Sequence, residues 1–297
     1  MLQAKKQFRK ALPMLLIAMM GVLLTGCGEQ MIVLDPKGPI GEAQKELMII
    51  SSVLCVIILV PVLAILTFII FRYRDKPGSR AAYKPDWDHN AKLEIVWWSI
   101  PIVVIAILAV ITVKYTYALE PSKPLVSEKE PLVIQVTALD WKWLFQYPEQ
   151  GIASVNEVYI PEDRPIRFEL TADAPMNSFW IPQLGGQMYT MSGMAMNLHL
   201  QADEPGTYYG SGANFSGKYF AHMTFEVHAA PEEAFESWVA HVKQTAPALT
   251  ENGYLALAEP GLSGKAAYSA FPEGLFEQIV TKYAVEGAGD QGHHRHH

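Results

Sequence analysis

The stretch Leu132–Tyr147, LVIQVTALDWKWLFQY, decides the fold of the larger part of this chain. It is rich in β-branched and aromatic residues and alternates in part between apolar and polar positions, which is typical of strands. Further segments of this kind follow it, namely ASVNEVYIP, IRFELTA, NLHLQA and FAHMTFEVHA, and Pro, Gly, Asp and Asn separate them. Their length and spacing predict an all-β sandwich over residues 131–230.

The segment after the sandwich predicts a helical arm over residues 231–284. PEEAFESWVAHVKQTA begins with Pro and acidic residues, as helices often do, and its apolar side chains fall on one face. That face carries Phe235, Trp238, Val239 and Val242. A second helix is expected at about 272–283, after a loop. The His-rich tail, 285–297, is expected to be disordered, and we assign it no function.

Two long apolar stretches precede the sandwich, and each is long enough to cross a bilayer, which takes about 20 residues. They predict membrane-spanning helices over 47–71 and 93–118. The loop between them, 72–92, carries the basic residues Arg72, Arg74, Lys76, Arg80, Lys84 and Lys92. By the positive-inside rule this loop is cytoplasmic, so the segment 27–46 and the sandwich lie on the outer side.

The first 26 residues have the pattern of a signal peptide, with a basic start and an apolar run too short to span a membrane. Leu24-Thr25-Gly26-Cys27 resembles the bacterial lipobox, which implies removal of residues 1–26 and lipidation of Cys27. A plain signal peptide with an incidental cysteine is the alternative. The expected location is the bacterial inner membrane, with the processed N-terminus and the sandwich in the periplasm.

The composition excludes several classes of function. The 297-residue chain has a net charge of −7 and no basic stripe beyond the N-terminus and one short loop, which argues against a nucleic-acid partner. Its two cysteines, Cys27 and Cys55, cannot form a disulfide framework. Neither lies in the second half of the chain, so no thiolate chemistry is available there. Cys55 is expected to be a small buried apolar residue of the first span.

Two outward-anchored helices followed by a β-sandwich resemble subunit II of the haem–copper respiratory oxidases. Three motifs carry the resemblance: LEIVWWSIP at 93–101, DWKW at 140–143 and NSFWIP at 177–182. The resemblance covers about residues 40–283. Together with the lipobox and the helical arm, it points to the quinol oxidase branch, which includes the cytochrome bo-type ubiquinol oxidases. It implies that the sandwich is cupredoxin-like.

In copper-bearing members of that family, a loop corresponding to GSGANFSGKYFAHM (210–223) helps to hold two copper ions. The positions of this chain that align with the ligands are Asn177, Gly212, Asn214, Ser216, Phe220 and Met223. Only Met223 keeps a ligand side chain. Gly212 and Ser216 stand where bridging thiolates would be, and neither a glycine nor a protonated hydroxyl can replace a soft thiolate. The chain is therefore expected to hold no copper and no haem, and the resemblance places haems and copper in subunit I.

Glu94 is the strongest candidate for a functional residue in the membrane part. Ionisable groups near membrane depth are costly and often mark a proton or ion path. The resemblance implies that this glutamate lies near the entrance of a proton-uptake channel into subunit I. The alternative is an interfacial glutamate that stabilises a helix N-terminus.

The remaining candidate residues have packing or surface positions as their plainer interpretation. The run MYTMSGMAM at 188–196 has four methionines, which suit Cu(I) but more often fill gaps in a core or interface, and we favour packing. His222 is expected at the surface, because Met223 and Phe225 have the opposite, inward parity of a strand. Trp141 and Trp143 are interpreted as packing aromatics.

These observations predict subunit II of a proton-pumping ubiquinol oxidase. The expected partners are subunit I, further small membrane subunits, membrane lipid and ubiquinol as the substrate of the complex. The chain would anchor and stabilise the complex without a redox centre of its own. The alternatives are a membrane-anchored lipoprotein that handles copper or senses the envelope, and a copper-bearing cytochrome c oxidase subunit. The residues do not distinguish ubiquinol from menaquinol.

Overall fold

The computed structural model describes residues 31–74 and 87–289, with side chains described up to 283. A short 3₁₀ turn, η1 (Ile32–Leu34), belongs to a small unit that ends at Asp35, and the rest of the chain forms one larger unit. The predicted signal peptide and Cys27 lie outside the described residues.

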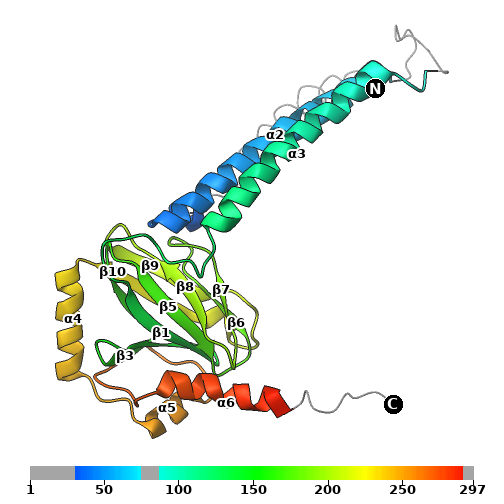
Figure 1. Cartoon of the computed structure of the whole chain (residues 1–297). Helices are drawn as coiled ribbons and strands as arrows, with labels where there is room; N and C mark the ends of the chain where they lie inside the picture. The colour runs from blue at the N-terminus through cyan, green and yellow to red at the C-terminus, as the bar shows by residue number, and fades with distance from the viewer. Residues whose placement is uncertain (1–30, 75–86, 290–297) are drawn as a thin grey trace, which may run out of the picture. The chain divides into compact units, whose positions relative to one another are not determined.

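Two helices are long and apolar enough to cross a membrane, α2 (Pro39–Arg72) and α3 (Ala91–Ala118). They lie side by side (Figure 1). α2 begins well before the predicted residue 47. Pro39 stands at its first position, where the missing N–H has no cost, so the polar residues that follow form helical turns outside the apolar run. Hydropathy marks only the apolar part of a helix. The predicted extramembrane segment 27–46 is therefore partly helical.

The sandwich consists of two sheets (Figure 1). The six-stranded sheet has the order β11-β3-β2-β1-β5-β8, and the five-stranded sheet has the order β4-β10-β9-β6-β7. The first sheet contains β1 (Leu132–Leu139), β2 (Lys142–Tyr147), β3 (Ile152–Val155), β5 (Ile166–Ala172), β8 (Met196–Leu200) and β11 (Ala266–Tyr268). The second contains β4 (Glu157–Pro161), β6 (Asn177–Trp180), β7 (Met188–Thr190), β9 (Gly206–Gly212) and β10 (Thr224–Ala230).

Most neighbouring strands are antiparallel, but β1 pairs with β5 and β10 pairs with β4 in parallel. The main core lies between the sheets and includes the fully buried Trp143, Phe145 and Phe179. The inward parity predicted for Met223 and Phe225 is confirmed, since both are buried. β10 ends at Ala230, where the sandwich was predicted to end, but β11 adds Ala266–Tyr268 to the six-stranded sheet, so a later segment completes the sandwich.

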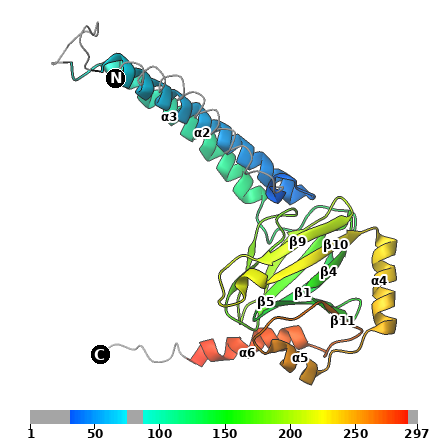
Figure 2. The ribbon, with the colours of Figure 1, turned by 180° about the vertical axis from the view of Figure 1, so that it is seen from behind.

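The arm contains three helices, α4 (Glu232–Thr245), α5 (Glu251–Ala258) and α6 (Leu275–Gly289). Figure 2 shows α4 beside β10 and β4. The predicted apolar face of α4 is confirmed, with Phe235, Val239 and Val242 buried. α5 and β11 form where only a loop was predicted. The expectation that the tail is disordered from residue 285 is wrong for its first part, because α6 continues to Gly289. Once a helix is established, each further residue adds a hydrogen bond without a new nucleation cost.

A second apolar cluster lies on the outer face of the six-stranded sheet, where the arm covers it. Leu139 and Leu144 of the sheet pack there against Leu275 and Ile279 of α6, together with Tyr254 of α5. The arm is thus an integral layer of the domain.

Candidate functional site

Most of the aligned ligand positions gather at one end of the five-stranded sheet. Asn177 begins β6, Gly212 ends β9, and Met223 lies just before β10. The segment between Gly212 and Met223 returns the chain from β9 to β10. Backbone bonds close its ends, because the Gly212 N–H donates to the Met223 carbonyl at 2.9 Å and the Ala213 N–H donates to the Ser178 carbonyl at 2.9 Å.

The Asn177 side-chain amide occupies the centre of this arrangement. Its Nδ2 donates to the Ser216 Oγ at 2.9 Å and to the Met223 Sδ at 3.1 Å. Its Oδ1 accepts from the Ser178 N–H at 2.7 Å. Asn177 is 1% exposed, so these are buried contacts between three of the predicted positions. An amide hydrogen-bond network stands where the resemblance placed metal ligands.

At two positions of the loop, neighbouring side chains lie so close to the backbone that glycine is required. A Cβ at Gly212 would lie 2.8 Å from the Asn177 Oδ1, so a cysteine there would collide with the amide. Gly217 has φ +106°, a left-handed conformation that side chains rarely adopt, and its Cβ would lie 3.3 Å from the Trp141 ring. The loop shape and the Asn177 amide therefore fit one another.

Asn214 and Phe220 lie at the margin of the network. The Asn214 Oδ1 accepts from the Ser178 Oγ at 3.1 Å. Phe220 begins the 3₁₀ turn η2 (Phe220–His222), is half-buried and packs edge-on against Phe215, with ring centroids 5.7 Å apart. Phe215 is 81% exposed, so this aromatic pair reaches the surface of the loop.

The DWKW motif holds the loop from the opposite sheet. Trp141 has φ +63° in the two-residue turn between β1 and β2, an uncommon conformation for a bulky residue. Its Nε1 donates to the Ser216 carbonyl at 3.1 Å, and its ring meets Tyr219 edge-on at 5.1 Å. The Trp143 Nε1 donates to the Met223 carbonyl at 3.4 Å. The two tryptophans pack as predicted, and they also position the loop, which the sequence did not predict.

Lys142, between these tryptophans, points to the other face of its sheet. It is 4% exposed, and its Nζ donates to the Glu259 carbonyl at 2.6 Å. Burial lowers the pKa of Lys142, although Asp140 and Glu259 oppose the shift. The motif thus joins the loop on one face to the arm on the other.

The donor set does not fit a copper pair. The groups at its centre are an amide, a hydroxyl and one thioether, and none of them can bridge two copper ions as a thiolate does. Among the described residues, no three His, Cys, Asp or Glu side chains are grouped so that they could hold a metal ion. The chemistry available to this loop is structural hydrogen bonding.

Glu94 lies in the first turn of α3 and takes part in capping it. The Asn90 Oδ1 accepts from the Leu93 N–H at 3.1 Å, and the Asn90 N–H donates to the Glu94 Oε1 at 3.2 Å. The same Oε1 lies 2.5 Å from the His89 Nδ1. The helix-terminal contacts proposed as the alternative are therefore present. His89 and Asn90 were missed as partners, although HN before an apolar run is a recognisable helix-start signal.

The remaining predicted residues divide between core and surface. Met188 and Met196 pack against the main core, whereas Met194 is 47% exposed. His222 is exposed, as predicted. Cys55 lies on α2 and is exposed in the isolated chain, so its expected role as a buried apolar residue stays a prediction.

A buried carboxylate that the sequence did not single out attaches the arm. Asp173 follows β5, and its side chain is 4% exposed. It accepts from the Tyr254 hydroxyl at 2.6 Å, the Tyr283 hydroxyl at 2.6 Å and the Lys282 Nζ at 2.7 Å. Burial alone would raise the pKa of Asp173, but these three hydrogen bonds outweigh it and hold the pKa below its usual value.

Comparisons with known proteins match the membrane part, most of the sandwich and most of the arm. Residues 29–115 match the family "Cytochrome C oxidase subunit II, transmembrane domain", 148–230 match its "periplasmic domain", and 243–287 match the "COX Aromatic Rich Motif". "Quinol oxidase subunit 2" of Bacillus anthracis is 44% identical over 269 residues, 91% of this chain and 92% of that protein.

Two further relatives are equally similar. "Cytochrome bo(3) ubiquinol oxidase subunit 2" of Pseudomonas aeruginosa is 44% identical over 278 residues, 93% of this chain and 83% of that protein. "Ubiquinol oxidase subunit 2" of Acetobacter aceti is 44% identical over 264 residues, 88% of this chain and 85% of that protein. The similarity therefore extends over the membrane helices, the sandwich and the arm together.

Proposed function

Because this chain belongs to the cytochrome c oxidase subunit II family and aligns over most of its length with members named quinol oxidase subunit 2, we propose that it is subunit II of a respiratory quinol oxidase. The complex would oxidise a quinol, reduce oxygen to water and move protons outward. The names of the relatives include both quinol and ubiquinol oxidases, and we take ubiquinol as the substrate.

The observation that carries the proposal is the Asn177 amide in place of a metal centre. A subunit that accepts electrons from cytochrome c needs a redox centre near its outer surface. Here the corresponding loop is held by hydrogen bonds from Asn177 to Ser216 and Met223. We therefore propose that electrons from quinol enter a partner subunit within the membrane, and that the haems and copper belong to that partner. The sandwich and the arm serve assembly and stability.

We further propose that Glu94 contributes to proton uptake into the partner subunit. Its carboxylate lies at the start of a membrane-spanning helix, and its side chain is 34% exposed in the isolated chain. An ionisable group at this depth is costly unless it has a function or a partner. The capping contacts with Asn90 do not exclude this role, since a carboxylate oxygen has more than one lone pair.

The proposed location is the inner membrane of a bacterium, with the sandwich in the periplasm. The two long apolar helices and the basic loop between them support this orientation. We also propose lipidation of Cys27, on the basis of the lipobox pattern alone. The diacylglyceryl mass on the N-terminal peptide of the processed chain tests it.

Oxygen consumption by the complex purified through this chain in mild detergent tests the function. The complex is supplied first with a short-chain ubiquinol and then with reduced cytochrome c. Turnover with ubiquinol alone is the expected result. Turnover with cytochrome c would refute the proposed path of electrons. A preparation without haem partners would instead favour a free-standing lipoprotein.

A further inference from the structure

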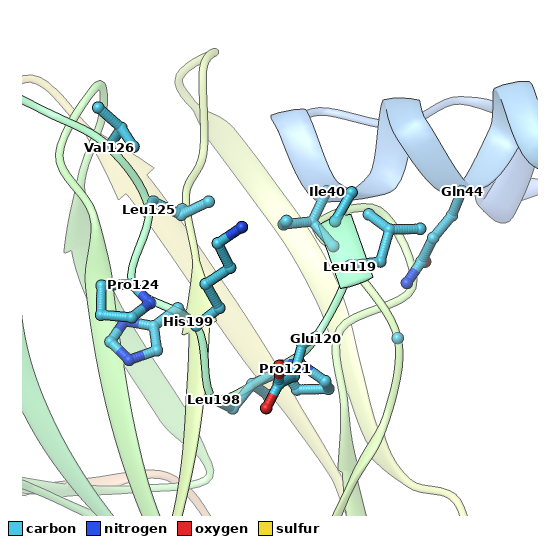
Figure 3. A pocket seen from close by; sticks show the side chains of 13 residues that line it. Ile40, Gln44, Leu119, Glu120, Pro121, Pro124, Leu125, Val126, Leu198 and His199 are labelled. Atoms are coloured by element: carbon cyan, nitrogen blue, oxygen red, sulfur yellow. The ribbon is translucent and has the colours of Figure 1, made fainter. Parts of the chain in front are cut away.

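A cavity of about 190 Å³ opens where the two membrane-spanning helices end on the side of the sandwich. Figure 3 shows Ile40, Gln44 and Leu119 from the helix ends on one side of it, and His199 and Leu125 on the other. Backbone bonds hold both sides. The Gly41 N–H donates to the Leu184 carbonyl at 3.0 Å, and the His199 N–H donates to the Pro121 carbonyl at 3.1 Å.

The ends of the two membrane-spanning helices fix the depth of the cavity relative to the membrane. α2 begins at Pro39 and α3 ends at Ala118, so Ile40 and Leu119 stand at the boundary between the membrane-spanning part and the sandwich. The lining is mostly apolar near the helix ends. A molecule bound here would have one part in the aqueous boundary region and another beside apolar helix surface.

His199 is an unpartnered polar group in the wall. It is 6% exposed, and its Nδ1 has no hydrogen-bond partner within the part of the chain that the structure describes. Burial and the neighbouring Arg167 lower the pKa of His199, so the ring is neutral at neutral pH. A neutral imidazole both donates and accepts hydrogen bonds. Buried polar groups without partners are costly, which points to a polar ligand or ordered water at this wall.

The two charged groups of the lining have opposite charges. Glu120 and Lys123 lie on the linker after α3, and both are exposed. The Glu120 carboxylate accepts from the Ser122 hydroxyl at 2.9 Å, which fixes its orientation. A ligand with one anionic and one cationic end would complement this pair, whereas a purely anionic ligand would face the Glu120 carboxylate.

We propose that this cavity binds the headgroup of a zwitterionic phospholipid, with its phosphate on Lys123, its ammonium group on Glu120 and His199 as a further hydrogen-bond partner. The lipid comes from the leaflet on the sandwich side, and its acyl chains lie along α2 and α3. The cavity is smaller than sites that enclose a drug-sized molecule, so only the headgroup enters it. The proposal depends on the membrane-spanning helices and is independent of the identity of the electron donor.

Lipid retention in the purified complex tests the proposal. The complex is delipidated in detergent, incubated with phosphatidylethanolamine and measured by native mass spectrometry. The wild type should retain one tightly bound lipid. Lys123→Ala should weaken its binding about tenfold, the usual effect of losing one charge-assisted contact. Lys129→Ala is the matched control, because Lys129 lies on the same linker but does not line this cavity.

A second variant separates ligand binding from simple packing. If a lipid bonds to His199, His199→Leu should lower lipid retention and the thermal stability of the lipid-loaded complex. If the cavity is dry, the same change removes an unpaired buried nitrogen and should raise stability, which would overturn the proposal. Equal retention in the Lys123 and Lys129 variants would also overturn it, as would preference for an anionic lipid or for a quinone. Haem content and ubiquinol turnover serve as controls for folding.

Discussion

Replacing Asn177 by alanine should loosen the β9–β10 loop without slowing the enzyme. The change removes the bonds from Nδ2 to the Ser216 Oγ and the Met223 Sδ, and leaves the buried Ser178 N–H without its acceptor. A neutral hydrogen bond contributes about 1 kcal/mol, a thioether acceptor less, and an orphaned buried N–H costs about 1–3 kcal/mol. We therefore expect a local destabilisation of about 2–4 kcal/mol.

Hydrogen–deuterium exchange in the intact complex measures this effect in the loop itself. Since about 1.4 kcal/mol corresponds to a tenfold change in an equilibrium, peptides covering residues 210–223 should exchange about 30- to 700-fold faster. Peptides from α2 and α3 should not change. Turnover with ubiquinol should equal that of the wild type, because the proposed path of electrons does not include the loop.

The matched control is His222→Ala, in the same loop but exposed, which should leave exchange unchanged. Unchanged exchange in Asn177→Ala would mean that the amide network does not hold the loop. Loss of ubiquinol turnover at normal haem content would refute the reasoning about the electron path, since the loop would then take part in the reaction.

Four further predictions concern the arm, its pH dependence, the membrane entrance and the helix start. Tyr254→Phe removes one hydrogen bond to the buried Asp173 carboxylate and should cost about 1.5–3 kcal/mol, seen as faster hydrogen exchange in α5. Because the folded-state pKa of Asp173 is lowered, its contribution to arm docking is present at neutral pH and is lost only as the pH falls through that lowered pKa. Hydrogen exchange in the arm that becomes faster as the pH is lowered from 8 to 6 would contradict this. Glu94→Gln should slow ubiquinol turnover several-fold at unchanged haem content, and unchanged turnover would leave Glu94 with its capping role alone. Gly38→Ala places a Cβ 2.0 Å from a backbone carbonyl oxygen of the sandwich, so less haem-containing complex should be purified from the same amount of membrane. Gly264→Ala has open space around its Cβ and should leave that yield unchanged.

The parts of the fold that were predictable have local causes. Met223 and Phe225 point inward because side chains alternate along a strand, and that alternation can be read from the residues alone. The two membrane-spanning helices were predictable from the length of their apolar stretches. α5 and β11 were not predictable in the same way, because their stability comes from packing on the sheet face around Leu139 and Leu144. That surface is assembled from distant segments.

The candidate site also combines features that were predictable from the sequence with features that were not. The absence of thiolates at the aligned positions follows from residue types alone, because Gly212 and Ser216 can be read directly from the loop sequence. The network that replaces them joins Asn177 to Met223 across 46 positions, and no local pattern encodes such a contact. The turn at Trp141 is also unexpected, because positive φ in a two-residue hairpin normally selects Gly or Asn. Its ring contacts with the loop compensate for the backbone cost.

The pairing of β11 with β3 has a consequence for the order in which the domain is completed. β3 forms the edge of its sheet until Ala266–Tyr268 arrive, and those residues lie more than a hundred positions later in the chain. Until that segment is synthesised, the sandwich therefore has an open edge that other strands can join. A chain truncated after the sandwich would keep that edge permanently. We expect such a chain to aggregate or to be degraded before it meets its partners.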